Sequence, residues 1–171
     1  ARRVRQAQVY SEIVPSSMPI AKMLEKNPKA IILSGGPSSV YEAGAPTLDS
    51  KIFEVGIPIF GICYGFQVMA AALGGVVTKT GKSEFGRTTL SHKSNSKLLA
   101  DLPKEFSVWM SHGDSVTTAP SGFTSTASTI DTEIVAFENS DAKFVGVQFH
   151  PEVLHSENGQ EILRRWLIDV V

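Results

Sequence analysis

The sequence contains a single cysteine in 171 residues, and it lacks any apolar stretch of the roughly 20 residues that a helix needs to cross a bilayer. One cysteine cannot form a disulfide within the chain, so we expect a reducing compartment, the cytoplasm, and no membrane partner. The sequence also lacks an excess of either charge, because 16 basic and 17 acidic residues give a formal net charge of -1. This balance argues against nucleic acid and favours a small molecule or another protein as the partner.

The sequence also lacks internal repeats, low-complexity segments and an interdomain linker. Its length and its 42% hydrophobic content suit one domain, so we expect a single unit over residues 1–171. The basic segment 1–8 is followed by a mixed segment rather than by an apolar core and a cleavage site, which argues against a secretory signal. The chain starts without Met, in what reads as a helix, and we expect it to be a fragment.

The first half of the sequence alternates strand-like and helix-like segments. The β-branched runs at 9–14 and 30–34 and the apolar run at 57–62 predict strands, the last of them buried on both faces. Helices are predicted by apolar residues at helical spacing, which are Ile20, Met23 and Leu24, then Leu48, Ile52 and Val55, then segment 64–75 ending at Gly74 and Gly75. We therefore predict a doubly wound α/β domain with a mostly parallel sheet flanked by helices.

The second half changes character, because its predicted strands are short and separated by turn residues. The strands are expected at 106–110, 122–128, 133–139 and 143–150, with turns at 120–122 and 139–141. They predict an antiparallel extension of the sheet. A closing helix is expected over 156–171, with Ser156 as its N-cap and with Ile162, Trp166, Leu167 and Val170 on its apolar face.

The single cysteine stands in Gly61-Ile62-Cys63-Tyr64-Gly65, between a predicted strand and a predicted helix. A nucleophile at a sharp strand-to-helix turn has a strained backbone, and side chains two residues before and after it would collide, so both places need glycine. The helix N-terminus would favour the thiolate, and the N–H of Tyr64 would face an oxyanion on the attacked carbonyl. The pattern alone also fits a small buried cysteine beside glycines that allow close packing.

A base and an orienting acid are predicted where an apolar strand runs into His150-Pro151-Glu152. Residues two apart in an extended segment point to the same side, so His150 and Glu152 can contact each other. Pro151 keeps His150 out of the helical region and preserves that geometry. A histidine at a strand end beside an exposed glutamate is the plain alternative, but together with Cys63 the pair makes a nucleophile, base and orienter.

Two loops and one helical residue are candidates for binding groups. The strand at 30–34 runs into Gly35-Gly36-Pro37, and Gly36 is our candidate for a second oxyanion donor, although the same residues make an ordinary turn. The loop in segment 109–116 suits the polar end of a small substrate, or is a plain connection. Gln67, one helical turn beyond Cys63, is placed to clamp the substrate.

The remaining histidines and charges are expected to have structural or solvent-exposed places. We expect His92 at the surface and His155 near the cap of the closing helix. Because no His/Cys cluster has metal-ligand spacing, no metal is expected. The charged residues Lys82, Glu84 and Arg87 are read as an exposed face that a partner domain could cover.

Segments 34–41, 60–67 and 145–153 together resemble the class I, triad-type glutamine amidotransferases, over nearly the whole chain. Segment 109–116 and the residues after His150 are most similar to the N-terminal glutaminase domain of the GMP synthetase branch. The resemblance implies a flavodoxin-like fold and an enzyme that hydrolyses L-glutamine to glutamate and ammonia. Phe66 stands where methionine is usual in that branch, which is a conservative apolar exchange.

The resemblance also implies roles for the candidate residues. Cys63 attacks the side-chain amide of glutamine, and His150, oriented by Glu152, protonates the departing ammonia and later activates the water that hydrolyses the γ-glutamyl thioester. The N–H groups of Gly36 and Tyr64 stabilise the oxyanions. The amino-acid end of the substrate is held by Gln67, Ser111, Gly113 and Asp114.

In the family, the ammonia passes to an ATP-pyrophosphatase synthetase domain that uses ATP and Mg to convert XMP to GMP, and no cofactor is implied for the glutaminase domain itself. We expect this synthetase domain, and a first β-strand with a D-F-G-like motif, to be missing from the chain. Without that strand, segment 9–14 would lack a neighbour in the sheet. A homodimer, if formed, would use the missing part.

Three alternatives stay open. An amidotransferase serving anthranilate, carbamoyl phosphate or CTP formation would share these segments, and only the loop at 111–114 speaks against it. A cysteine hydrolase of γ-glutamyl compounds would need no ammonia acceptor. A binding or regulatory module would have no need for all three of Cys63, His150 and Glu152.

Overall fold

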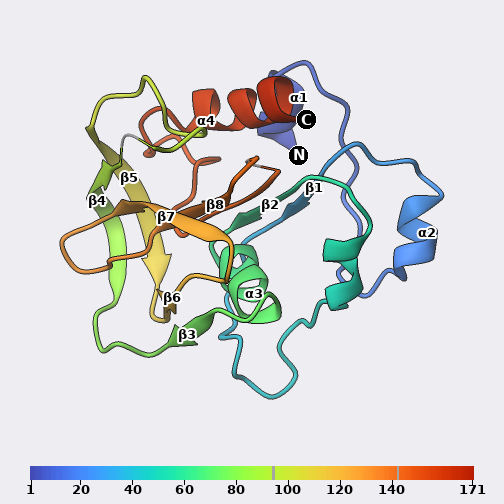
Figure 1. Ribbon diagram of the computed structural model, residues 1–171, viewed down its shortest axis with the longest axis horizontal. Helices are drawn as coiled ribbons and strands as arrows, with labels where there is room; N and C mark the ends of the chain where they lie inside the picture. Colours follow the sequence, from blue (N-terminus) through green and yellow to red (C-terminus); the bar gives the residue numbers. More distant parts are fainter. Residues whose placement is uncertain (94, 142) are drawn as a thin grey trace.

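Seven strands form the main sheet of the computed structural model, which describes residues 1–93, 95–141 and 143–171. Their order across the sheet is β1 (Ile31–Leu33), β2 (Ile59–Ile62), β9 (Phe144–Val147), β8 (Ala136–Asn139), β7 (Phe123–Ser128), β4 (Glu84–His92) and β5 (Glu105–His112) (Figure 1). The pairs β1–β2 and β2–β9 are parallel, and the other pairs of this sheet are antiparallel. The predicted α/β class with an antiparallel extension is confirmed, and the sheet is mixed.

Helices cover both faces of this sheet (Figure 1). On one face lie α1 (Arg2–Gln6) and α4 (Gly159–Arg165), which continues as a π-helical turn over Trp166–Val170. The other face carries α3 (Tyr64–Ala72) and a small antiparallel sheet of β3 (Val76–Thr78) and β6 (Ser115–Thr118). The short helix α2 (Ile20–Leu24) and a 3-10 helix at Ser50–Glu54 lie toward the β1 edge.

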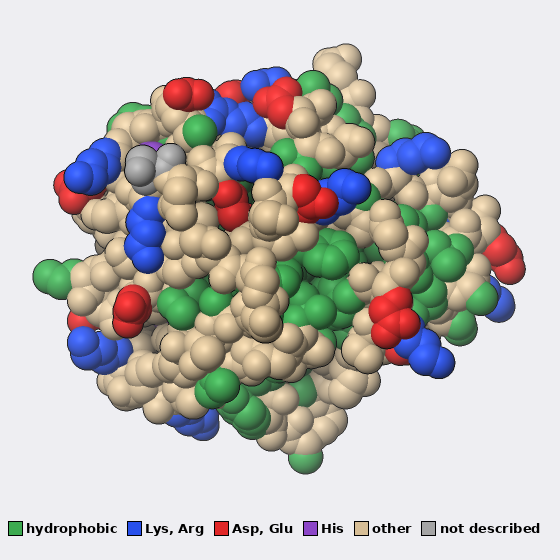
Figure 2. Space-filling model, in the orientation of Figure 1, with side chains coloured by type: hydrophobic (Ala, Val, Ile, Leu, Met, Phe, Trp, Pro, Cys, Tyr) green, Lys and Arg blue, Asp and Glu red, His purple; other side chains and the backbone are tan. Residues whose placement is uncertain are grey.

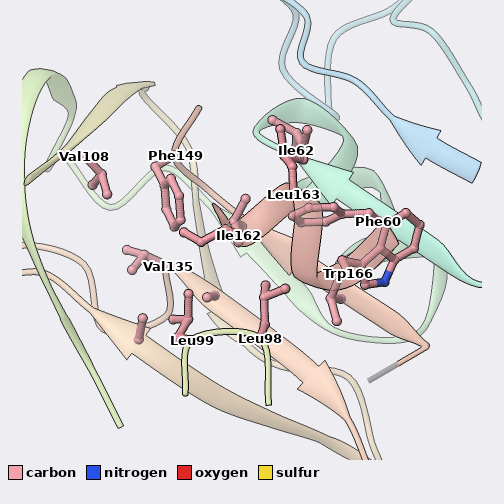
Figure 3. Close-up of a cluster of buried hydrophobic side chains, with 14 of the residues drawn as sticks. Phe60, Ile62, Leu98, Leu99, Val108, Val135, Phe149, Ile162, Leu163 and Trp166 are labelled. Atoms are coloured by element: carbon pink, nitrogen blue, oxygen red, sulfur yellow. The ribbon is translucent and has the colours of Figure 1, made fainter. Parts of the chain in front are cut away.

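Side chains of β2 alternate between two apolar clusters, as a strand buried on both faces requires. Phe60 packs against Trp166 of the closing helix, with ring centroids 5.3 Å apart (Figure 3). On the opposite face, Ile59 shares a cluster with Phe66, whose ring lies 4.6 Å from that of Phe137. These two clusters fix β2, and therefore the residue that follows it, from both sides.

The predicted apolar face of the closing helix is confirmed, but its beginning is not. Ile162, Trp166 and Leu167 are buried. The helix begins at Gly159, with Asn158 in a left-handed conformation as its N-cap. Ser156 therefore does not cap it, because its hydroxyl is used by the backbone of two other segments.

The predicted strand at 9–14 is wrong. These residues run as an irregular segment, in which the side chains of Tyr10 and Ile13 are 81% and 82% exposed. A strand exists only where a neighbour offers backbone partners, and β-branched residues alone do not supply one.

Leu24, predicted to be on an apolar helix face, is also exposed. Hydrophobic side chains gather at the surface around β1, β2 and α3 (Figure 2).

Candidate active site

Cys63 occupies a strained turn between β2 and α3. Its backbone angles are φ 52° and ψ -107°, a region that residues with a side chain rarely adopt. A Cβ on Gly61 would lie 2.8 Å from the carbonyl oxygen of Gly65, and a Cβ on Gly65 would lie 2.1 Å from that of Leu33. The predicted steric need for glycine at both positions is therefore confirmed.

One cavity of about 560 Å³ brings the candidate residues together. Its lining includes Gly36, Cys63, Tyr64, Gln67, Ser111, Gly113, Asp114 and His150, which are all the predicted site residues apart from Glu152. They come from the ends of β1, β2, β5 and β9. The parallel strands β1, β2 and β9 end at the same edge of the sheet, so residues distant in sequence meet there.

His150 contacts both of the groups that the sequence paired with it. Its Nδ1 lies 2.7 Å from Oε1 of Glu152. Hydrogen bonding to Cys63 and then to Glu152 raises the pKa of His150 to about 10. Since Nδ1 faces Glu152, Nε2 is the ring nitrogen left for Cys63, and the raised pKa favours the imidazolium form of His150.

The backbone of His150 is fixed by β5 and by Ser156. The N–H of His150 donates to the carbonyl of Trp109 at 3.0 Å. The Ser156 hydroxyl donates to the His150 carbonyl at 2.7 Å and accepts from the Trp109 N–H at 2.9 Å. His155 does not cap the helix either, since its ring stacks on Trp109 at 4.7 Å between centroids. Both residues after the triad segment thus hold it against β5.

The loop after β1 lies against Cys63 and His150. A Cβ on Gly35 would lie 3.0 Å from Cε1 of His150 and 3.5 Å from Cβ of Cys63. A Cβ on Gly36 would meet the Tyr64 ring at 3.7 Å, and Tyr64 begins α3, so its N–H has no intrahelical acceptor. Sequence reasoning selected Gly36 and missed Gly35, although the doubled glycine was the signal for a close approach by both.

Gln67 is placed beside the cavity but is already bonded within the protein. Its Nε2 donates to the carbonyl of Asp114 at 2.8 Å and to Oε1 of Gln148 at 3.0 Å. A carboxamide nitrogen has two hydrogens, so only the oxygen of Gln67 stays free for a ligand. The Asp114 carboxylate accepts a hydrogen bond from the Ser39 hydroxyl, which joins the two loops on either side of the cavity.

Glu84, expected on an exposed face, is buried, and this expectation is wrong. It stands opposite His112 in the β4–β5 register, and its Oε2 lies 3.0 Å from Nε2 of that histidine. Hydroxyls of Thr129 and Thr132 donate to the same carboxylate at 2.7 and 2.6 Å. Desolvation acts to raise the pKa of Glu84, but these hydrogen bonds hold it below its ordinary value.

The His112–Glu84 pair supports the candidate binding loop. Nδ1 of His112 donates to the Asp114 carbonyl at 2.9 Å, so this carbonyl accepts from His112 and Gln67 together. Sequence reasoning missed the pair because its members are 28 residues apart and meet only through strand register. Neither residue stands in a local motif that indicates this contact.

Within residues 1–93, 95–141 and 143–171, no three His, Cys, Asp or Glu side chains gather as metal ligands. In the same described part of the chain, no helix is long and apolar enough to cross a membrane.

Comparison with known proteins places these residues in a family. The model of the class-I glutamine amidotransferases matches residues 1–170. The chain is 61% identical over 168 residues to a glutamine-hydrolysing GMP synthase of Streptomyces coelicolor and 56% identical over 169 residues to that of Thermobifida fusca. These alignments cover 98% and 99% of the chain, which spans only 32% of each curated relative.

Solved structures agree with this match. A Thermoplasma acidophilum protein described as a candidate GMP synthase subunit superposes with a TM-score of 0.84 and 31% identity, covering 97% of this chain and 83% of that one. A glutamine amidotransferase of Thermotoga maritima shares the fold at a TM-score of 0.72 and 24% identity, over 88% of this chain and 68% of that one. The chain belongs to the class-I glutamine amidotransferase family.

Proposed function

We propose that this chain hydrolyses L-glutamine to glutamate and ammonia, and that the ammonia serves a synthetase that converts XMP to GMP in the cytoplasm. The single observation that carries the proposal is Cys63 held at a strained elbow with the His150–Glu152 pair within hydrogen-bond reach. Strain of this kind costs about 1 to 3 kcal/mol and is kept where it serves a reaction. A module that only binds would have no use for it.

The first half of the reaction follows from the positions of Cys63 and His150. The sulfur attacks the side-chain amide carbon of glutamine and forms a C–S bond, while the carbonyl oxygen takes the negative charge. The N–H groups of Gly36 and Tyr64 are the candidate donors to that oxyanion. His150 gives its Nε2 proton to the departing nitrogen, the C–N bond breaks, and ammonia leaves a γ-glutamyl thioester.

The second half reverses the roles. Neutral His150 removes a proton from water, the hydroxide attacks the thioester carbonyl, and the C–S bond breaks to regenerate the thiolate. Glu152 keeps the Nδ1 proton in place and stabilises the imidazolium, so that the other nitrogen exchanges protons in both halves. We assign the amino-acid end of the substrate to the oxygen of Gln67 and to the loop residues Ser111, Gly113 and Asp114.

The ammonia acceptor is proposed from the curated relatives, which are named as GMP synthases and are about three times as long as this chain. ATP and Mg would belong to the synthetase partner, and no cofactor is required by the steps above. A glutaminase that serves another acceptor would use the same residues, so the acceptor needs its own experiment.

The test uses a glutamine-like electrophile and then glutamine itself. We expect stoichiometric labelling of Cys63, lost in His150→Ala, and a γ-glutamyl adduct on the Cys63 peptide by mass spectrometry. Glutamate release should rise when a GMP synthetase partner, ATP and XMP are added. A thiol no more reactive than free cysteine would refute the glutaminase, and release that ignores XMP would refute the acceptor.

A further inference from the structure

Gln148 is a completely buried carboxamide that lies against the nucleophile, and the steps above give it no part. Its Nε2 is 3.8 Å from the sulfur of Cys63, and its Oε1 is 3.0 Å from Nε2 of Gln67. A buried carboxamide is held in place only if its polar atoms have partners, because leaving them without hydrogen bonds is costly. Here one of those partners is the reacting atom.

The orientation of the Gln148 amide is determined by a fixed acceptor two hydrogen bonds away, the Asp114 carbonyl. The Asp114 carbonyl can only accept, so Gln67 must present its nitrogen to it. The second hydrogen of that nitrogen then points to Gln148 and selects its oxygen. Gln148 is left with its nitrogen, a donor, facing the sulfur.

The fixed acceptor is itself held by the buried His112–Glu84 pair. His112 donates to the same Asp114 carbonyl, and Glu84 holds the other ring nitrogen of His112. Side-chain exposure in this pair is 1% for His112 and 4% for Glu84, so water does not compete for these bonds. The Asp114 carbonyl therefore accepts from both His112 and Gln67, and the remaining hydrogen of the Gln67 amide is given to Gln148.

A donor beside the sulfur favours the thiolate over the thiol. The other protein group near the sulfur, the carbonyl of Ser111 at 3.6 Å, has the opposite preference, since it can accept from a thiol but cannot donate to a thiolate. Apart from His150, Gln148 is thus the side chain among the described residues whose hydrogen bond to Cys63 selects the reactive form.

We propose that Gln148 is a further catalytic residue, whose amide N–H stabilises the Cys63 thiolate, and that Gln67 and the Asp114 carbonyl hold the amide in that orientation. The proposal rests on the glutaminase function above and adds a residue to it. In the thioester, the same N–H again faces the sulfur and favours its departure in the hydrolysis step.

The test measures the rate at which iodoacetamide modifies Cys63 as a function of pH, followed on the peptide that contains this cysteine. Gln148→Met keeps the length of the side chain and removes the donor. We expect the midpoint of the profile to rise by about one pH unit and the rate at neutral pH to fall by about tenfold. Gln148→Asn, which withdraws the amide by one carbon, should shift the midpoint in the same direction.

Gln160→Met is the matched control, because the Gln160 amide donates to the Arg3 carbonyl and Gln160 does not line the cavity. We expect it to keep the wild-type profile. The charged and titratable groups that line the cavity around Cys63 are Glu42, Tyr64, Lys79, His112, Asp114 and His150, with Glu152 behind His150. All are retained in these variants, so a shift specific to position 148 reports the lost donor.

The outcomes separate this proposal from the one on which it rests. A folded Gln148→Met protein with the wild-type midpoint would overturn the role of Gln148, even if its glutaminase activity were low, because a structural defect slows turnover without moving the midpoint. Near-UV circular dichroism identifies folded variants. A shifted midpoint in a protein that forms no γ-glutamyl adduct in its wild-type form would instead overturn the glutaminase and leave the donor role standing.

Discussion

Two histidine–glutamate pairs flank the same cysteine, and they differ in exposure. The His150–Glu152 pair has side-chain exposures of 18% and 41%, whereas the His112–Glu84 pair has 1% and 4%. The first faces the cavity and has a ring nitrogen left for chemistry. In the second, both ring nitrogens of His112 are bonded to protein oxygens. The same two residue types therefore leave one imidazole open to the cavity and hold the other entirely within the protein.

The partner of Nε2, and not proximity to Cys63, separates the two histidines: in His150 it is the sulfur, and in His112 it is the Glu84 carboxylate. Both histidines line the cavity. In His150 only Nδ1 contacts a protein oxygen, because the other ring nitrogen faces the sulfur of Cys63. His112 acts through the position of the Asp114 carbonyl.

The largest expected effect removes the reactive histidine. His150→Ala should lower kcat for glutamine hydrolysis by about 10³-fold or more, because the general acid and base are lost together. Ammonia release measures this. His155→Ala is the control, since that ring stacks on Trp109, and its activity should stay within a few-fold of wild type. Equal losses in both variants would show that the segment's packing, not the imidazole, is what matters.

Breaking the buried His112–Glu84 pair should lower the free energy of unfolding, with a smaller effect on kcat than the loss of His150. Glu84→Ala leaves the buried Nε2 of His112 without its hydrogen-bond partner and should lower the free energy of unfolding by about 3 kcal/mol. Urea unfolding measures this, and Glu105→Ala, a change of an exposed glutamate on β5, should stay within about 0.5 kcal/mol. A stable Glu84→Ala protein that has lost kcat as severely as His150→Ala would contradict the division between the two pairs.

Glu152→Gln should have a smaller effect on the rate than loss of His150. An orienting carboxylate that is fully buried is worth about 10⁴-fold in kcat. Glu152 is 41% exposed, so water shares its role and we expect a loss of about 10²-fold. Steady-state kinetics with glutamine would check it, and an unchanged kcat would place Glu152 outside the mechanism.

The smallest effect concerns stability against pH. The pKa of His150 is raised from 6.5 to about 10 in the folded protein, so its contribution is complete below pH 6.5 and is lost as the pH rises through about 10. The free energy of unfolding should therefore fall across this interval. Cys63→Ala removes the largest cause of the raised pKa and should flatten the slope, whereas an unchanged slope would separate His150 from Cys63.

The sequence was sufficient for features that depend on local spacing. The glycines two residues either side of Cys63 follow from a steric argument about one turn, and His150 and Glu152 follow from the two-residue period of an extended segment. The family resemblance then assigned the chemistry. The fold class followed from alternating patterns of the same local kind.

The features that sequence reasoning missed depend on contacts between distant segments. Glu84 and His112 meet through strand register, and Gln148 is linked to Cys63 across two neighbouring strand ends. Ser156 had the residue type of a helix cap, but its hydroxyl is hydrogen-bonded to the backbone of Trp109 in β5 and of His150. Segment 9–14 had the composition of a strand and no partner to make it one.

The backbone at Cys63 has a consequence for the durability of the protein. Glycine adopts a positive φ without strain, so Cys63→Gly would relieve about 1 to 3 kcal/mol of backbone strain. Heat resistance and reactivity therefore pull in opposite directions at a single position. A version of this chain selected only for heat resistance would lose Cys63 first, and with it the nucleophile of the proposed glutaminase reaction.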